Sequence, residues 1–304
     1  MTRLFKLAAL AAALLAAPAA FAQPAKVVMG YATASDYLAI FVAKEKGYFA
    51  RRNIDAELSR VPIITNVPPA LISGSMQLGV ATMPGLLQAV DGGLDLVLVA
   101  GAARHIKERP TISLVARKDL KIEKPADLEG RKVGVSGLNN VMDMFLRKWM
   151  RKAGADDRKV TLIEVQIPQI PDMIRNGTID AATAVEPIRS AVAASGAGNI
   201  VAEFFADVNP DVLVSGWIAT GDYARENPAI VKGFREAVDE ALVYIDTNPA
   251  DLRDIEKKYL GFNAPRWPKF SNAAADADLK VFLDIGKELG VYRTAIDPAK
   301  VVWK

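Results

Sequence analysis

The chain has 304 residues, of which 51% are hydrophobic and 24% charged, and its formal net charge is +3. This composition is typical of a folded protein, and a net charge so near zero gives no electrostatic reason to expect nucleic acid or an anionic membrane as a partner. The sequence contains no cysteine, which excludes disulfides, thiolate nucleophiles, iron–sulfur clusters and thiolate zinc sites.

The N-terminus has the pattern of an export signal. Arg3 and Lys6 give it a positive start, residues 7–15 form a short apolar run, and Ala20-Phe21-Ala22 is a small-x-small cleavage site. We expect cleavage after Ala22 and a mature chain in the periplasm, because the apolar run is too short for an ordinary transmembrane helix. An uncleaved anchor is the alternative. The absence of cysteine also removes the residue that carries the lipid in exported lipoproteins.

The first part of the mature chain alternates between strand-like and helix-like segments. Short apolar runs predict strands at residues 27–30, 56–61, 78–81 and 96–100, and helical periodicity separates them at residues 38–49, 67–72 and 86–90. Glycines at positions 47, 74, 92 and 93 mark the turns. The β-branched run 111–117 is predicted to cross into a second lobe.

The second part repeats this alternation. Strands are predicted at residues 132–136, 160–165, 179–184 and 200–202, and helices begin at Val141, Ile170 and Ile188. The run 212–219 is predicted to return to the first lobe, which helices at residues 230–245, 251–259 and 276–289 would complete. We therefore predict a signal peptide over residues 1–22, a first lobe from residues 23–116 and 213–304, and a second lobe from residues 117–212.

Two segments that lie far apart in the sequence have similar residue patterns. Residues 74–84 are GSMQLGVATMP and residues 177–187 are GTIDAATAVEP, so each passes from a glycine turn through an apolar strand to a proline that opens a helix. Repeated units of strands and helices imply an α/β fold of two lobes, each with a mostly parallel sheet flanked by helices. Two such lobes would form a ligand cleft at the carboxyl ends of their strands.

Sequence signals for catalysis are few. His105 is the only histidine, and the chain has no Gly-x-Ser-x-Gly elbow, phosphate-binding loop or His-Glu-x-x-His helix. Two positioned carboxylates suffice for some hydrolases, so acid chemistry stays open. We predict a binding protein without a catalytic site, a metal or a cofactor. His105 is expected in a solvated polar loop, the alternative being a position at the rim of a ligand site.

Helix N-termini are the best candidates for a binding site, because each presents unpaired N–H groups and a partial positive charge. The loop 136–140 is small and polar, so it either lets its backbone approach a ligand or only caps a helix. Asp36 and Glu186 either cap helices or accept a donor from the ligand. Two carboxylates at such positions weaken the case for a purely anionic ligand. The candidates at these helix starts are Ser35, Asp36, Thr82, Met83, Ser136, Gly137, Asn139, Asn140 and Glu186.

Three further residues are candidates for the wall of the cleft. Tyr31 and Trp217 lie near strand ends, where an aromatic ring can stack on a ligand. For Trp217, stacking and simple core packing are both open. Asn66 precedes the pair Pro68-Pro69, which fixes the start of a helix, and its amide would give the cleft a polar wall.

Four motifs carry a resemblance to a known family. They are AKEKGYF at residues 43–49, the segment 74–84, ADLEGRKVGV at residues 126–135 and AVEP at residues 184–187. In this order they resemble the sulfonate, nitrate and taurine substrate-binding proteins of ABC importers, a superfamily that also includes binding proteins for thiamine pyrimidine precursors. The resemblance covers nearly the whole mature chain. Where that family commonly has aromatic-acid-proline, this chain has Val185-Glu186-Pro187, so the identity of the ligand does not carry over.

The resemblance implies a type II periplasmic binding protein that acts as a monomer. Such a receptor closes on a small polar organic molecule, here a sulfonate, a carboxylate or a pyrimidine-like compound, and docks on an ABC permease of the inner membrane. Closure would bend the connecting strands near Arg117 and Ala219. By the same resemblance, the ligand would meet Ser35 and Asp36, Thr82 and Met83, the loop 136–140, and Glu186.

Two alternatives belong to other functional classes. Eukaryotic thiamine-pyrimidine synthases share this superfamily but carry out chemistry with a cysteine-rich iron segment. This chain departs from them because it has no cysteine and begins with an export signal. The other alternative is a ligand-sensing partner of a membrane receptor, which would use the same closure for signalling.

Overall fold

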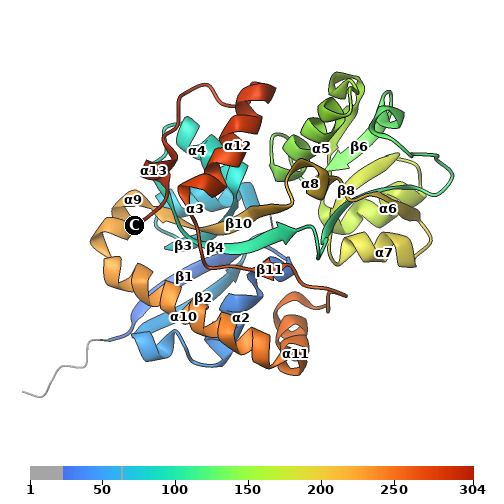
Figure 1. Ribbon diagram of the computed structural model, residues 1–304. Helices are drawn as coiled ribbons and strands as arrows, with labels where there is room; N and C mark the ends of the chain where they lie inside the picture. The colour runs from blue at the N-terminus through green and yellow to red at the C-terminus, as the bar shows by residue number, and fades with distance from the viewer. Residues whose placement is uncertain (1–22, 63) are drawn as a thin grey trace, which may run out of the picture.

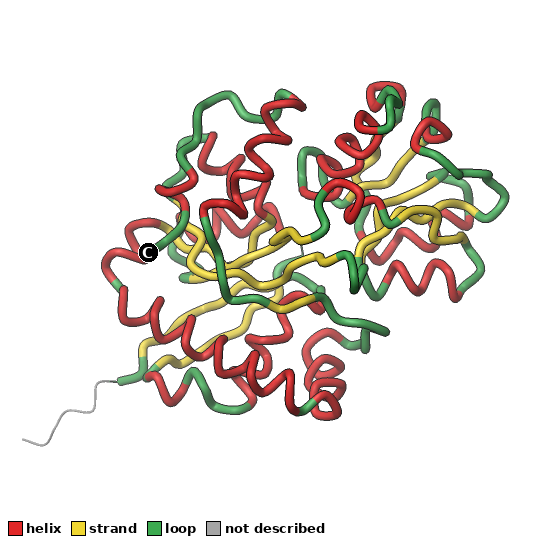
Figure 2. The backbone as a smooth tube through the Cα atoms, viewed as in Figure 1, coloured by secondary structure: helices red, strands yellow, loops and turns green. Residues whose placement is uncertain are grey.

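The computed structural model describes residues 23–62 and 64–304, and the predicted signal at residues 1–22 lies outside them. The chain folds into two α/β lobes, each built on its own sheet (Figures 1 and 2). This confirms the predicted two-lobed α/β fold class, but both sheets are mixed, where mostly parallel sheets were expected, because the strands that link the lobes run antiparallel to the others. Within the described ranges, no helix combines the length and the hydropathy needed to cross a bilayer.

The first lobe contains a six-stranded sheet in the order β11-β4-β10-β3-β1-β2. Strands β1, β2 and β3 are parallel, whereas β10 is antiparallel to both β3 and β4, and β11 is antiparallel to β4. The strands are β1 (Ala25–Tyr31), β2 (Ile54–Arg60), β3 (Leu78–Thr82), β4 (Leu96–Ile106), β10 (Asp211–Thr220) and β11 (Lys269–Phe270).

Helices cover both faces of this sheet (Figure 1). Apolar side chains of α2, α10 and α11 pack on one face, and those of α3, α4 and α12 pack on the other. Because both faces are covered, the central strands β1, β3 and β10 are mostly apolar. The helices of this lobe are α2 (Leu38–Glu45), α3 (Val67–Ile72), α4 (Met83–Asp91), α9 (Gly221–Glu226), α10 (Pro228–Thr247), α11 (Pro249–Leu260), α12 (Asp276–Leu289) and α13 (Pro298–Val301).

The second lobe contains a five-stranded sheet in the order β7-β6-β8-β5-β9. Strands β6, β7 and β8 are parallel, and β5 is antiparallel to its neighbours β8 and β9. Its elements are β5 (Ile112–Arg117), β6 (Lys132–Val135), α5 (Val141–Lys152), β7 (Thr161–Glu164), α6 (Ile170–Arg175), β8 (Ala181–Val185), α7 (Ile188–Ala194), β9 (Gly198–Ala202) and α8 (Phe204–Val208).

The two sheets have the same arrangement of strands, as the similarity between residues 74–84 and 177–187 predicts. The order β2-β1-β3-β10 in the first sheet corresponds to β7-β6-β8-β5 in the second, and the fourth strand is antiparallel in both. Gly74 and Gly177 occupy equivalent turns with φ angles of 73° and 75°, a backbone conformation that favours glycine. The parallel strands of each lobe therefore end at equivalent edges.

Strands β4 and β10 form a long antiparallel pair that leads towards the second lobe. They are paired from Leu96 and Thr220 at one end to Ile106 and Asp211 at the other. His105 lies in this pair and is 1% exposed, so the prediction of a solvated loop is wrong. The physical reason is the covering ring of Phe205 in α8, whose centroid is 5.0 Å from that of the imidazole.

The lobes are linked before β5 and after β9. Residues 112–116 pair within the second sheet, whereas the sequence-based division places them with the first lobe. Strand β10 starts at Asp211 in the first sheet, two positions before the boundary expected at residue 213. Arg117 and Ala219, where bending is predicted, are paired inside sheets. Because α8 packs on α5 through Phe204 and Phe205, we expect bending in residues 107–111 and 209–210 instead.

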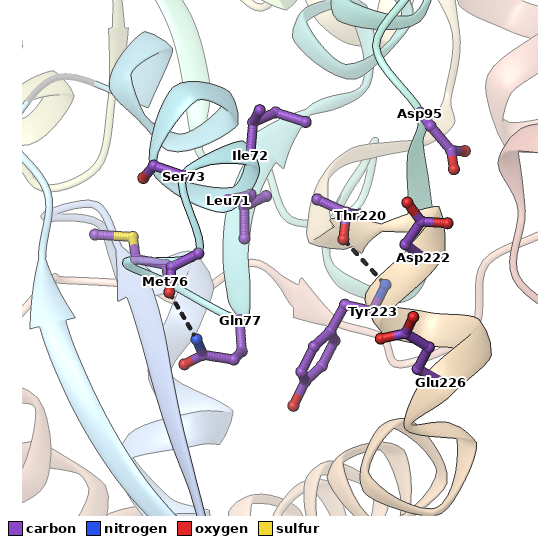
Figure 3. A pocket seen from close by; sticks show the side chains of 11 residues that line it. Leu71, Ile72, Ser73, Met76, Gln77, Asp95, Thr220, Asp222, Tyr223 and Glu226 are labelled. Atoms are coloured by element: carbon purple, nitrogen blue, oxygen red, sulfur yellow. Dashed lines mark hydrogen bonds between the residues drawn. The ribbon is translucent and has the colours of Figure 1, made fainter.

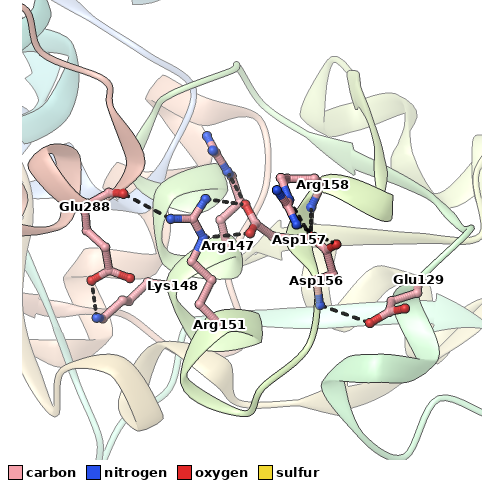
Figure 4. Close-up of polar contacts among 8 residues, drawn as sticks. All are labelled: Glu129, Arg147, Lys148, Arg151, Asp156, Asp157, Arg158 and Glu288. Atoms are coloured by element: carbon pink, nitrogen blue, oxygen red, sulfur yellow. Dashed lines mark hydrogen bonds and ion pairs between the residues drawn. The ribbon is translucent and has the colours of Figure 1, made fainter.

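The lobes also touch through α5 and α12. The rings of Phe145 in α5 and Phe282 in α12 have centroids 5.6 Å apart, and both belong to one buried apolar cluster. At the rim of this contact Lys148 forms an ion pair with Glu288, and Arg151 Nη1 donates to the Glu288 carbonyl oxygen over 3.0 Å (Figure 4). These contacts hold the second lobe against a C-terminal helix of the first.

Candidate ligand-binding site

The carboxyl edge of the first sheet brings several candidate residues together. Thr82 ends β3 and is paired with Ser215 of β10, and its hydroxyl group caps α4. Tyr31 ends β1 and is paired with Arg60, which ends β2. Arg60 is exposed, and its Nε donates to Thr33 Oγ1 over 2.8 Å. Ligands of α/β folds bind beyond such carboxyl edges.

Asp36 lies beside this edge in the short 3-10 helix η1 (Ser35–Tyr37). Its Oδ2 accepts a hydrogen bond from Ser215 Oγ over 3.1 Å. Burial raises the pKa of the Asp36 carboxyl from 3.8 to about 6. The groups that counteract this are the Ser215 hydroxyl and a backbone N–H, neither of which carries a charge. Asp36 is thus a half-buried carboxylate whose hydrogen-bonding partners are neutral.

Two first-lobe candidates are buried in the core. Trp217 is 1% exposed, and its ring meets Tyr37 and Phe234 edge-on at centroid distances of 5.9 and 5.4 Å. Met83 is fully buried in the first turn of α4. For Trp217 the structure therefore shows the packing alternative, because Tyr37 of η1 and Phe234 of α10 both pack against its ring.

The remaining first-lobe candidates have different surroundings. Ser35 is buried, and its Oγ donates to Glu256 Oε1 in α11 over 2.6 Å. Tyr31 is largely buried and meets Phe41 edge-on at a centroid distance of 4.9 Å. Asn66 is exposed at the start of α3 and does not cap that helix with its side chain. Of this lobe's candidates, Asp36 and Thr82 are the two that meet around Ser215.

In the second lobe, the loop 136–140 is held by its own hydrogen bonds. Asn140 Oδ1 accepts from the backbone N–H groups of Met142 and Asp143 over 3.0 and 3.2 Å and so caps α5. Asn140 Nδ2 donates to Ser136 Oγ over 2.9 Å. A Cβ at Gly137 would lie 3.1 Å from Asn140 Nδ2, so the cap leaves little room for a side chain there. Of the two alternatives predicted for this loop, the structure therefore shows the one in which it caps a helix, here α5.

Asn139 is the point where this loop meets the other lobe. It adopts a positive φ of 56°, and its N–H donates to Asp143 Oδ2 over 2.6 Å. Its carbonyl oxygen accepts from Gln88 Nε2, in α4 of the first lobe, over 2.8 Å. A direct hydrogen bond between the lobes therefore joins the second turn of α4 to the loop that precedes α5.

Glu186 is 3% exposed and belongs to a buried ionic network. Its Oε1 lies 3.1 Å from Arg189 Nη1, and its carboxylate accepts from both the N–H and the hydroxyl of Ser190. Arg189 Nη2 also pairs with Glu203, which follows β9. The carboxylate therefore caps α7 and neutralises Arg189, so the capping alternative applies to Glu186 as well.

Two surface cavities lie away from these residues. One, of about 430 Å³, is lined by residues including Gln77, Asp95, Thr220 and Tyr223 (Figure 3). Gln77 and Asp95 precede β3 and β4, so this cavity lies at the opposite edge of the first sheet from Thr82. The other, of about 480 Å³, lies beside Arg151 and the segment 154–158, whose ion pairs are drawn in Figure 4. Neither cavity contains a predicted site residue.

The structure adds three residues that sequence reasoning missed. Ser215 joins Asp36 to the end of β3, Gln88 joins the lobes, and Glu164 ends β7, where its Oε1 accepts from the Leu138 N–H over 2.8 Å. Glu164 had a sequence signal, because it is polar and close to the end of a predicted strand, and Ser215 had a weaker one, as a polar residue inside an apolar strand. Gln88 had none, since it lies within a helix. Among residues 23–62 and 64–304, no group of His, Asp and Glu side chains is arranged to hold a metal ion.

The chain has two sheets flanked by helices, and two segments link them. Their parallel strands end at equivalent edges, and this arrangement is the two-lobed fold of periplasmic binding proteins. The periplasmic aliphatic sulphonate-binding protein SsuA of Escherichia coli has this fold, with a TM-score of 0.77, 21% sequence identity, and coverage of 92% of this chain and 98% of SsuA. At that identity the likeness shows the fold alone. The protein family described as NMT1/THI5 like matches this chain over residues 34–252. The chain belongs to this family, which confirms the resemblance predicted from the sequence.

Two curated relatives match over shorter stretches. A Haemophilus influenzae protein named for thiamine biosynthesis is 32% identical over 147 residues, which are 48% of this chain and 45% of that protein. The formylaminopyrimidine-binding protein of Halalkalibacterium halodurans is 29% identical over 126 residues, which are 41% of this chain and 37% of that protein. The chain thus spans less than half the length of these two relatives, and their names cover more than one kind of activity.

Proposed function

We propose that this chain is the solute-binding receptor of an ABC importer, which captures one small polar organic molecule between its lobes and delivers it to a membrane permease. The observation that carries the proposal is the hydrogen bond between Gln88 and Asn139. It joins α4, the helix that follows β3 in the first lobe, to the loop that follows β6 in the second, and both lie after the carboxyl edges where α/β folds bind ligands. Family membership over residues 34–252 supports the same reading.

The proposed mechanism is closure of the two lobes by hinge motion. A ligand that touches both carboxyl edges stabilises the closed state by the contact energy that the open state lacks. The segments 107–111 and 209–210 would bend, whereas the two lobes move as rigid bodies. We propose that the mature chain works in the periplasm as a monomer, after loss of residues 1–22.

Binding without chemistry is part of the proposal. His105 is buried with both ring nitrogens unpartnered, and burial lowers its pKa from 6.5 to about 4, so it is neutral at neutral pH. A thiamine-pyrimidine synthase-like enzyme is the competing function, and a relative named for thiamine biosynthesis is the observation that favours it. Such an enzyme would consume its ligand, whereas a receptor releases it unchanged.

The test is a ligand screen on the mature chain, residues 23–304. We expect native mass spectrometry to find one small molecule per chain, and small-angle X-ray scattering to show a smaller radius of gyration when it is bound. Recovery of the unaltered molecule after denaturation would support a receptor, and saturable product formation would contradict it. Neighbouring genes for a permease and an ATPase would favour transport, whereas a neighbouring sensor kinase would favour the sensing alternative.

A further inference from the structure

We propose that Arg189 is a positioning residue of the hinge, whose guanidinium ties the two linking segments together where they enter the second lobe and so sets the direction in which the lobes close. The linking segments are residues 107–111 and residues 209–210. This inference rests on the proposed receptor function and adds the group that controls its closure.

At the first lobe, the two linking segments are joined by backbone bonds. The pairing of β4 with β10 ends at Ile106 and Asp211, and the N–H of Lys107 then donates to the Pro210 carbonyl oxygen over 2.8 Å. The segments therefore leave the first lobe side by side, as a continuation of the antiparallel pair. A bend at this end involves both of them.

At the second lobe, backbone pairing stops short of the linking segments, and side chains continue it. Pairing between β5 and β9 ends with Leu114 and Ala202. The next residues towards the linking segments are Ser113 on one side and Glu203 on the other, which brings their side chains within reach of each other. The Ser113 hydroxyl donates to Glu203 Oε2.

Arg189, in the first turn of α7, completes this connection. Its Nε donates to Ser113 Oγ, and its Nη2 pairs with Glu203. One guanidinium therefore bridges β5, which follows the first linking segment, and the residue before α8, which leads into the second. Its Nη1 also lies 3.1 Å from Glu186 Oε1. The Glu186 N–H donates over 2.9 Å to the carbonyl oxygen of Thr111, the last residue of the first segment.

Helix α8 carries the connection from Glu203 to the second linking segment. It begins one residue after Glu203 and ends at Val208, directly before residues 209–210. Its Phe205 stacks on Phe145 of α5 at a centroid distance of 4.4 Å, so the helix is packed on the second lobe. Holding the start of α8 through Glu203 therefore determines where the second segment begins.

The energetics of this network favour a role in geometry over a role in stability. Arg189 is 6% exposed and Glu186 is 3% exposed. A buried ion pair gains roughly as much attraction as it loses in desolvation, so apolar residues of similar volume would stabilise the lobe equally well. Apolar contacts have no direction, whereas a planar guanidinium holds its acceptors at fixed angles. The network therefore adds a defined orientation of β5 and α8.

The test measures the distance between the lobes in the free mature chain by double electron–electron resonance. Because the chain has no cysteine, nitroxide labels on Val243→Cys in α10 and Asp172→Cys in α6, both exposed, mark one lobe each. Arg189→Lys keeps the charge, but one ammonium group cannot span the three acceptors, so the distance distribution should widen about twofold. Arg147→Lys is the matched control and should leave the width unchanged, because Arg147 of α5 pairs with the buried Asp157, which follows that helix.

The outcomes separate this inference from the proposed function. A width for Arg189→Lys equal to that of wild type would overturn the inference and leave the receptor function standing. Equal widening by Arg147→Lys would also overturn it, because general loosening of the lobe would then be the cause. If circular dichroism shows that Arg189→Lys is unfolded, Ser113→Ala replaces it with the same expected result, since it removes the hydroxyl and leaves both ion pairs. The expected widening in a chain that binds nothing in the ligand screen would support the hinge role of Arg189 and contradict the receptor function.

Discussion

Replacing Asp36 by Asn should make the free protein more stable at neutral pH. The pKa of this carboxyl rises from 3.8 to about 6 on folding. Each pKa unit corresponds to about 1.4 kcal/mol, so the ionised carboxylate lowers the free energy of unfolding by about 2 to 3 kcal/mol. An Asn at this position keeps an oxygen that accepts from Ser215 and removes the charge.

The sign of the pH dependence follows from the raised pKa. Below about pH 4 the carboxyl is protonated in the folded and the unfolded chain, and it imposes no cost. Between pH 4 and 6 the folded chain holds a proton that the unfolded chain has released, so stability falls as the pH rises through this window. Above pH 6 the full cost is present. The advantage of Asp36→Asn should therefore be absent near pH 4 and complete at pH 7.5.

Urea denaturation of the mature chain at pH 4.0 and pH 7.5, followed by circular dichroism, measures this difference. Asp254→Asn, at an exposed position of α11, is the matched control and should change stability little at either pH. The reasoning is refuted if Asp36→Asn is no more stable than wild type at pH 7.5. An equal gain at both pH values would refute it too, because the gain would then have another cause.

Three further changes test other parts of the structure. Glu186→Gln breaks a buried ion pair with Arg189 and should lower the free energy of unfolding by about 3 kcal/mol, measured by urea denaturation. A free energy of unfolding equal to that of wild type within error would contradict the buried network. Phe282→Ala removes a ring from the α5–α12 contact and should lower the free energy of unfolding by about 3 to 5 kcal/mol. An unchanged midpoint of urea denaturation would mean that the contact is not formed. Gly137→Val crowds Asn140 and should weaken ligand binding about tenfold while the fold is kept, measured by calorimetry, and unchanged affinity would place the site elsewhere.

Most of the fold is predictable because local patterns determine it. Helices α3 and α12 have the predicted bounds of residues 67–72 and 276–289, since their apolar periodicity is uninterrupted and their ends carry proline or glycine signals. Strand β4 extends six residues beyond its predicted end, to Ile106. Its last residues are polar, and pairing with β10 across more than a hundred positions keeps them in the strand.

The environment of single side chains is less predictable, because it depends on distant segments. His105 lies in a polar stretch, yet Phe205 covers it and its ring is buried. Trp217 is close to a strand end, but the ring of Phe234 in α10 encloses it. In each case a helix from another part of the chain decides whether the side chain meets solvent or the core. No local pattern specifies which helix that is.

The duplicated backbone explains why the fold could be predicted further than the site. Thr82-Met83-Pro84 and Val185-Glu186-Pro187 stand at equivalent ends of β3 and β8, yet Met83 is fully buried in an apolar cluster and Glu186 in an ionic one. Similarly, Asn140 caps the helix after β6, whereas Asp36, after β1, bonds across to β10. Strand pairing and turn geometry require only a class of residue at each position, so they survive such changes. The charges and hydrogen-bond donors at these positions do change with the residue, and they determine what the carboxyl edges can bind.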